Sequence, residues 1–373
     1  MTAAPTNKTP ASATPLELRH VERTLDAFPP AIHGNPLNLL LMERATPIAS
    51  ADRYLRALDS PELCEERREY LATPTADWPF PSAALGERPD PVCLSDVLFE
   101  RFGEAGQILH TQSDIGQILL QRVDQTSPDI VVLMVVDGLS YYDLPENEHM
   151  LPCLVSGVST TAFGHRSVLG RPPICQRLFS RDYKRQLGFT YFDPDENELA
   201  CELYSVFGGG KVHRITELDE ALRLLRTKRM SKGFVQVTSS GLDQLCHQHH
   251  DRPPIQGYVD EIMTRFERLV SCLSTGRRKV LACMTSDHGI LWRDHLQGKP
   301  QLCPGIAPED VHHPRYVLGG ISRDCTLPWR SEGTTYSLLR FPFLTRPLRH
   351  TEWGVHGGIS AWESIVPLVI QET

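Results

Sequence analysis

The sequence DIVVLMVVDG, residues 129–138, decides the fold. Seven apolar residues in a row, from Ile130 to Val136, are followed by Asp137 and Gly138. An unbroken apolar run of this length predicts a strand that is buried on both faces of a parallel sheet. Gly138 allows the chain to turn sharply where the strand ends. We therefore expect Asp137 to lie at the carboxyl end of a central strand.

Two later stretches have the same form. They are GFVQVTSSGLD, residues 233–243, and KVLACMTSDHG, residues 279–289, and each places polar residues directly after an apolar run. Helical patterns precede them, in residues 216–230 and 255–274. Strands that alternate with helices predict an α/β fold with a mainly parallel central sheet and helices on both faces.

The chain before this region has a different character. Residues 1–15 form a polar leader without an apolar core, which we expect to be disordered. Residues 16–128 have mostly helical patterns, interrupted at residues 73–92 by a proline-rich stretch that is typical of a linker. We therefore expect a leader, a helical N-terminal region at residues 16–128, and an α/β domain at residues 129–373.

The composition is that of a globular protein, with 40% apolar and 23% charged residues. A net charge of −8 argues against nucleic-acid binding by bulk positive charge, although it leaves room for a local basic groove. No apolar run approaches the roughly 18 residues that a membrane span requires, so we expect no membrane partner. The ten cysteines contain no CxxC pair, which predicts reduced, mostly buried thiols and a cytoplasmic protein.

Three aspartates follow the predicted strands within a few residues. Asp137 follows the first strand, Asp243 the second and Asp287 the third. Because functional residues of such sheets gather at the carboxyl ends of strands, we expect these carboxylates to lie together. Each aspartate alone would be read as an ordinary strand-ending turn. Their shared placement is what indicates a site.

Histidines accompany these aspartates. His247 lies four residues after Asp243, a spacing that would place both on one face of a helical turn. His288 directly follows Asp287, and His356 lies in the glycine-flanked loop EWGVHGGIS. Carboxylates and imidazoles together favour zinc, with manganese as the alternative. Two such ions about 4 Å apart can hold the attacking and leaving oxygens of an in-line phosphoryl transfer.

A nucleophile is available in VSTTAFGHRSVLG, residues 158–170. Thr160 and Thr161 each offer a hydroxyl that would lose its proton more readily beside a metal ion. Either hydroxyl, taken alone, would more often be a helix cap. The residues themselves leave the choice between the two threonines open.

The order of these motifs resembles the alkaline phosphatase superfamily, over residues 129–370. In that pattern an Asp-Gly after the first strand is followed by a Thr or Ser nucleophile, an Asp-x-x-x-His, an Asp-His and a late His. The resemblance implies an alkaline-phosphatase-like fold in which one metal is held by Asp243, His247 and His356. It implies a second metal held by Asp137, Thr161, Asp287 and His288.

The same resemblance bears on the nucleophile and the substrate. The superfamily's phosphodiesterases have the pattern Thr-x-x-Asn-His, which implies Thr161 as the nucleophile because it lies four residues before His165. Gly164 stands where those enzymes often have asparagine. We take Gly164, His165 and Arg166, which lie at and beside this position of the pattern, as candidate substrate residues.

The end of the chain is similar to PglZ-domain proteins. The similar segments are VHGGISAWESIVPLVI, residues 355–370, and RYVLGG, residues 315–320. PglZ proteins are associated with BREX-type phage-defence systems. The resemblance therefore implies a short or stand-alone PglZ catalytic domain at residues 129–373, with other defence-system proteins as partners.

Charge near these motifs indicates the substrate class. Residues 166–185 contain six basic residues and one acidic residue, and residues 315–349 contain six arginines. Such runs are usually solvated faces. Because both adjoin the predicted site, we expect nucleotide or nucleic-acid phosphate esters as substrates.

The sequence thus predicts a metal-dependent phosphodiesterase or nuclease in preference to a monoesterase. One alternative is a weakly active or inactive scaffold subunit of a defence complex. Another is a phosphomutase, for which the roughly 80 residues between Thr161 and Asp243 leave little room for a cap domain.

Overall fold

The computed structural model describes most of the chain from residue 88 onward. The segments left out of this range are 106–108, 146–149, 208–210, 228–229, 248–250, 277, 297–300, 308–310, 312 and 332. The leader expected at residues 1–15 and the helical region expected up to residue 87 lie outside the described residues.

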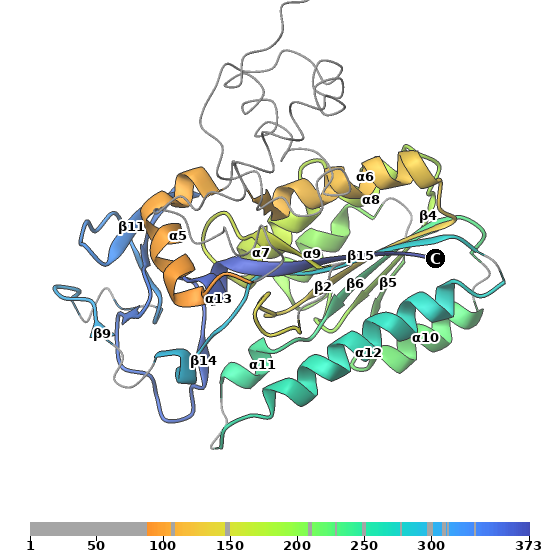
Figure 1. Cartoon of the computed structure of the whole chain (residues 1–373). Helices are drawn as coiled ribbons and strands as arrows, with labels where there is room; N and C mark the ends of the chain where they lie inside the picture. Colours follow the sequence, from red (N-terminus) through yellow and green to blue (C-terminus); the bar gives the residue numbers. More distant parts are fainter. Residues whose placement is uncertain are drawn as a thin grey trace, which may run out of the picture. The chain divides into compact units, whose positions relative to one another are not determined.

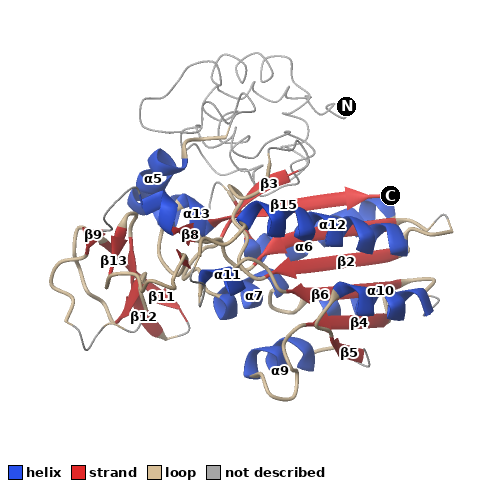
Figure 2. Ribbon diagram, turned by 90° about the horizontal axis from the view of Figure 1, so that it is seen from below, coloured by secondary structure: helices blue, strands red, loops and turns tan. Residues whose placement is uncertain are grey.

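Within the described residues, an eight-stranded sheet forms the centre of the molecule, in the order β1-β3-β15-β7-β2-β6-β4-β5. Its strands are β1 (His110–Thr111), β2 (Ile130–Val136), β3 (Met150–Leu154), β4 (Arg185–Thr190), β5 (Lys211–Arg214), β6 (Gly233–Ser239), β7 (Val280–Ser286) and β15 (Ile365–Glu372). All neighbours are parallel except β15, which runs antiparallel to β3 and β7. The predicted mainly parallel sheet is confirmed (Figure 2).

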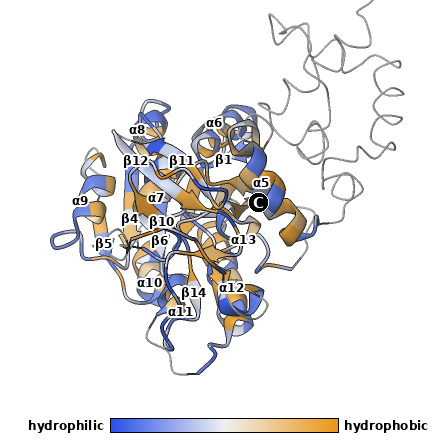
Figure 3. Ribbon diagram, turned by 90° about the vertical axis from the view of Figure 1, so that its left-hand side faces the viewer, coloured by the Kyte–Doolittle hydropathy of each residue, from blue (hydrophilic) through white to orange (hydrophobic). Residues whose placement is uncertain are grey.

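Helices cover both faces of this sheet, as predicted (Figure 1). One face carries α6 (Ile115–Thr126), α8 (Ile174–Phe179) and α9 (Glu198–Ser205), and the other carries α10 (Leu218–Thr227) and α12 (Ile255–Leu273). Side chains of α6, α8 and α9 form one apolar cluster with alternate residues of β2. On α12, the buried residues recur at helical spacing, and four of its five charged residues are exposed. Figure 3 shows hydrophilic and hydrophobic residues interspersed along this helix.

The remaining elements lie outside the main sheet and the five helices just named. They are α5 (Pro91–Ala105), η3 (Gln112–Asp114), α7 (Thr161–Leu169), α11 (Asp243–Cys246), β8 (Leu291–Trp292), η4 (Arg293–Leu296), β9 (Gln301–Leu302), β10 (Tyr316–Leu318), β11 (Thr326–Ser331), β12 (Thr334–Leu339), β13 (Phe343–Leu344), β14 (Gly354–Val355) and α13 (Ala361–Ser364). Strands β10, β12 and β11 form a small antiparallel sheet, while β13 pairs with β9 and β14 with β8. Among the helices that the structure describes, none is both long and apolar enough to cross a bilayer.

The region before β2 differs from the continuous helical run expected there. The chain forms α5, then β1 and the turn η3, and only then α6. The Asp114 carboxylate accepts hydrogen bonds from the backbone N–H and the hydroxyl of Thr111, at 2.7 and 2.8 Å, which stabilise the turn. Strand β1 pairs in parallel with β3 and so belongs to the main sheet.

The cysteines also differ in part from expectation. Cys303 and Cys325 form a disulfide, so the prediction that the thiols are reduced is wrong for this pair. The cause is tertiary: the segment around β9 lies beside the start of β11, and both cysteines share an apolar cluster with Val317 and Leu339. The other cysteines of the described residues are free thiols.

Candidate metal centre

The carboxyl ends of three neighbouring strands form the centre. Val136 pairs in register with Ser286 of β7 and with Ser239 of β6, so Asp137 and Asp287 leave the sheet side by side. The Gly138 N–H donates to Asp287 Oδ1 at 3.0 Å. Asp243, at the start of α11, donates its N–H to the Asp137 carbonyl at 3.2 Å. The expectation that the three aspartates lie together therefore agrees with the geometry.

Asp137, Asp287 and His288 form a buried group of ligand-type side chains. One oxygen or nitrogen of each lies within 4.8 Å of the others. His288 Nε2 is 3.6 Å from Asp137 Oδ1 and 3.8 Å from Asp287 Oδ2. Asp287 and His288 are fully buried, and Asp137 is nearly so. We refer to these three residues as the buried group.

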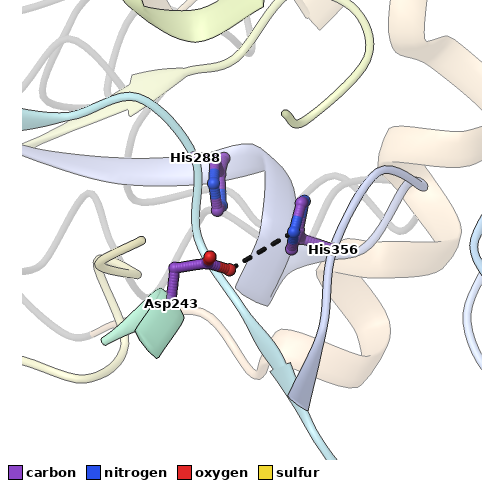
Figure 4. Close-up of side chains that lie close together, drawn as sticks. All are labelled: Asp243, His288 and His356. Atoms are coloured by element: carbon purple, nitrogen blue, oxygen red, sulfur yellow. Dashed lines mark ion pairs between the residues drawn. The ribbon is translucent and has the colours of Figure 1, made fainter. Parts of the chain in front are cut away.

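Asp243, His288 and His356 form a second group, whose ligand-type atoms also lie within 4.8 Å of one another (Figure 4). His356 Nε2 is 3.3 Å from Asp243 Oδ1, and the rings of His288 and His356 stack with centroids 4.1 Å apart. Asp243 and His356 are half-buried. We refer to these residues as the outer group; His288 belongs to both groups, whereas the resemblance assigned it to one metal.

His247 does not take the place that its spacing predicted. Helix α11 ends at Cys246, and His247 already has extended backbone, with φ −122° and ψ 149°. Because the helical turn stops one residue early, Asp243 and His247 do not share a helical face. His247 is exposed and belongs to neither group. It still acts on the site electrostatically: burial raises the pKa of Asp243, but His356, His288 and His247 together hold that pKa below its usual value.

Thr161 lies at the buried group as the first residue of α7. Its Oγ1 is 3.2 Å from His288 Nε2 and 3.4 Å from Asp137 Oδ1. Thr160 is the N-cap residue of the same helix and lines a neighbouring pocket. Of the two threonines left open by the sequence, Thr161 is therefore the one whose hydroxyl meets the carboxylate–histidine cluster.

The three residues expected to contact substrate have other partners in the structure. A Cβ added to Gly164 would lie 1.8 Å from the Asp287 carbonyl oxygen, so α7 packs directly on this backbone. The Gly164 N–H donates within the helix, to Thr160 at 2.9 Å. Buried His165 places Nδ1 3.0 Å from Asp287 Oδ2. Arg166 forms a two-pronged ion pair with Glu202 of α9, at 2.6–3.0 Å, and lines the pocket beside Thr160.

Two residues of the site were not found from the sequence. Tyr191 follows β4, and its hydroxyl donates to Asp137 Oδ2. The strand-end rule would have found it, had QLGFTY been recognised as a strand. Gln112, in η3, donates from Nε2 to the carbonyls of Ser286 and Asp287 at 2.8 and 2.7 Å. No sequence pattern links Gln112 to a strand end so distant in the chain.

The histidine tautomers follow from the backbone. Nδ1 of His288 lies 3.1 Å from the Gly289 carbonyl, and Nδ1 of His356 lies 2.9 Å from the Ser159 carbonyl. Because a carbonyl only accepts hydrogen bonds, each Nδ1 carries a proton and each Nε2 is the ring nitrogen that faces the centre. Both Nε2 atoms face carboxylate oxygens, and positive charge, from a proton on the ring or from a metal ion, balances this arrangement. Histidines that bind metals are oriented in this way.

The charges of the side chains in the centre also favour a bound cation. Burial, Asp287 and Asp243 raise the pKa of Asp137. Burial opposes protonation of His288, yet the three surrounding carboxylates raise its pKa to about 10. Three carboxylates in one buried space repel one another unless positive charge compensates them. The residues present therefore fit divalent cations.

The loop that carries His356 is fixed by a buried ion pair. The guanidinium of Arg315 donates to both oxygens of Glu363, at 2.9 and 2.7 Å, and neither side chain is exposed. Glu363 also accepts from the Gly358 N–H at 3.0 Å. The two terminal segments singled out in the sequence, residues 315–320 and 355–370, are thus joined directly.

Searches of family models and of curated proteins found no match. Several solved structures are similar in fold. Human ectonucleotide pyrophosphatase/phosphodiesterase 5 has a TM-score of 0.43 and 9% identity, over 65% of this chain and 87% of that one. Phosphonoacetate hydrolase from Sinorhizobium meliloti, in complex with phosphonoformate, has a TM-score of 0.43 and 12% identity, over 65% and 90%.

A third similar structure is the C-terminal periplasmic domain of EcEptC from Escherichia coli in complex with zinc. Its TM-score is 0.33 at 10% identity, and the alignment covers 44% of this chain. The chain spans 64% of the length of that domain.

Proposed function

We propose that this chain is a metal-dependent hydrolase of phosphoric esters of the alkaline phosphatase type, with two divalent cations, zinc first and manganese as the alternative. The observation that carries the proposal is the convergence of ligand-type atoms at the centre: three carboxylates, which repel one another, meet Nε2 of His288 and of His356, at 3.6 Å from Asp137 and 3.3 Å from Asp243. Cations between them would relieve the repulsion.

The residues would hold two cations, and His288 would lie between them because it belongs to both groups. The buried group, with the Thr161 hydroxyl beside it, would hold one ion. Asp243 and His356 of the outer group would hold the other, and His247 would complete this set only if the segment after α11 rearranged. Bound cations would lower the pKa of the Thr161 hydroxyl and screen the negative charge of a phosphoryl group.

The reaction assigned to this chain begins with attack by Thr161 Oγ1 on phosphorus. The new Oγ–P bond forms as the bond to the leaving oxygen breaks, and the proton of the Thr161 hydroxyl passes through water to that leaving oxygen. Water then hydrolyses the phosphothreonine, which returns the threonine hydroxyl and releases the phosphate product. Asp287, His165 and Gln112 hold the strand end that faces Thr161 during both steps.

Diesters of nucleotides or nucleic acids are the proposed substrates, because Arg166 and the neighbouring Arg171 line the pocket beside the centre. We also propose a PglZ-type role in phage defence with other defence proteins as partners, and a cytoplasmic location. The support for PglZ is the direct bond between the two segments that resemble it, through Arg315 and Glu363.

The test combines metal analysis with assays on bis-aryl and mono-aryl phosphates in added zinc or manganese. Two ions per chain and preference for the diester are expected. The Thr161→Ala variant is expected to keep its metal and lose turnover to background, while Thr161→Ser retains a measurable rate. Full activity of Thr161→Ala would refute the mechanism, and metal-free, inactive wild-type protein would favour the scaffold alternative.

A further inference from the structure

A pocket of about 680 Å³ opens beside the centre. One wall comes from Thr160 and Phe163, at the start of α7, and from Arg166 and Arg171 further along the chain. The opposite wall comes from the small antiparallel sheet. Its volume falls in the range of about 300–1,000 Å³ that is usual for small-molecule sites. Because Thr160 directly precedes Thr161, the pocket begins one residue from the proposed nucleophile.

Aromatic rings form the wall that belongs to the small sheet. Tyr316 of β10 and Tyr336 of β12 meet edge to face, with centroids 5.6 Å apart. Tyr316 also stacks on His313 at 4.4 Å, and His313 lies 5.4 Å from the ring of His356. Both tyrosines are half-buried and line the pocket. A continuous run of rings therefore leads from the pocket to the outer group.

The charge of the pocket is opposite to that of the chain. Among the described residues that line it, two are arginines and none carries a carboxylate, although the net charge of the chain is −8. Glu202 holds the guanidinium of Arg166 in a fixed orientation. Arg171 is exposed at the rim. Because Glu202 neutralises Arg166, Arg171 is the cation that gives this pocket a preference for an anionic ligand over a neutral one.

We propose that this pocket binds one nucleoside arm of a single-stranded nucleic-acid diester. The base would lie against Tyr336 and Tyr316, and the adjoining phosphate would meet Arg171. The inference rests on the proposed function, whose substrate class it sharpens. Tyrosine faces accept bases of any sequence, whereas a base in a duplex is already stacked and paired and would have to leave the helix to enter.

Binding of a fluorescein-labelled single-stranded DNA oligonucleotide to the Thr161→Ala protein tests this inference without turnover. Tyr336→Ala is expected to weaken binding about tenfold, and Tyr336→Phe, which keeps the ring, to restore it. Arg171→Ala is expected to weaken binding and to reduce the slope of log affinity against log salt by about 0.7. The matched controls Tyr258→Ala on α12, and Arg181→Ala at its ion pair with Asp124, should bind like the parent.

The outcomes separate the pocket from the chemistry. The binding variants are made in the Thr161→Ala protein. If neither Tyr336→Ala nor Arg171→Ala changed its affinity for the oligonucleotide, the proposed pocket would be refuted, whatever ester the enzyme hydrolyses. Duplex DNA that binds as tightly as the single strand, with the same sensitivity to Tyr336, would overturn the single-strand assignment. Loss of binding in these variants would support the pocket even if wild-type protein hydrolysed no ester, a result that refutes only the proposed function.

Discussion

The two ligand groups of the centre differ in depth and in what holds them. The buried group lies where β2 and β7 leave the sheet, and it is fixed by strand pairing and by Gln112. The outer group takes Asp243 from a one-turn helix and His356 from a loop that depends on the Arg315–Glu363 pair. One half of the centre is therefore part of the sheet, whereas the other half lies on a short helix and a loop that connect sheet strands. An ion in the outer group should therefore exchange more readily.

The largest expected effect is at Asp287, the deepest carboxylate of the buried group. Asp287→Asn keeps the size of the side chain but removes its charge, so we expect activity to fall about 1000-fold or more, which corresponds to about 4 kcal/mol of transition-state stabilisation. Steady-state assays with saturating zinc, and metal content after dialysis, measure the loss. The exposed Asp219→Asn serves as control. Retention of more than a tenth of the activity would contradict the central role of the buried group.

The next effect concerns the support of the outer group. Arg315→Met leaves the buried Glu363 without its partner, so we expect a loss of about 3–5 kcal/mol in the free energy of unfolding. The exposed pair Arg265–Glu261 is the control, and Arg265→Met should cost at most about 0.5 kcal/mol. Denaturant unfolding gives both values. Equal losses in the two variants would show that the buried pair does not fix the His356 loop.

A smaller effect is expected at Tyr191. Tyr191→Phe removes the hydroxyl that donates to Asp137, so the buried group should bind its ion about 10- to 100-fold more weakly. Competition with a chelator measures the affinity. Tyr204→Phe is a matched control, because its hydroxyl donates to the Phe189 carbonyl at 2.9 Å and not to the centre. Tyr191→Phe should therefore bind the metal more weakly than Tyr204→Phe does. An unchanged affinity in Tyr191→Phe would show that Tyr191 only packs against the centre.

The smallest effect is expected at His247. Because this side chain is exposed and lies outside both groups, His247→Ala should change zinc affinity less than about tenfold. His356→Ala, which removes a member of the outer group, should weaken the affinity more. Titration of the metal-free proteins with zinc compares them. If the two variants lost affinity equally, His247 would have to join the outer group when the ion binds.

The sequence predicted the half of the centre that depends on strands. The apolar runs before Asp137 and Asp287 end at equivalent positions because adjacent parallel strands keep register, and that rule needs no tertiary knowledge. It failed at β4, where Gln186 and Gly188 interrupt the apolar run, and Tyr191 was missed with it.

Residues held by tertiary contacts could not be predicted in the same way. The spacing of Asp243 and His247 indicated a helical face, but α11 stops at Cys246 because residue 247 adopts extended backbone. Gln112 reaches carbonyls 174 and 175 residues away, and only the folded chain brings these groups together. The Cys303–Cys325 disulfide has the same origin.

The contact between Gly164 and Asp287 has a consequence for how the centre tolerates change. Helix α7 rests on the end of β7 main chain to main chain, and Thr161 lies one turn earlier on the same helix. Main-chain contact therefore limits how far α7 stands from the buried carboxylates, in addition to the packing of Val168 and Leu169 in the apolar core. The position of Thr161 beside the buried group therefore depends on residue 164, which only glycine can fill without moving α7 off the end of β7.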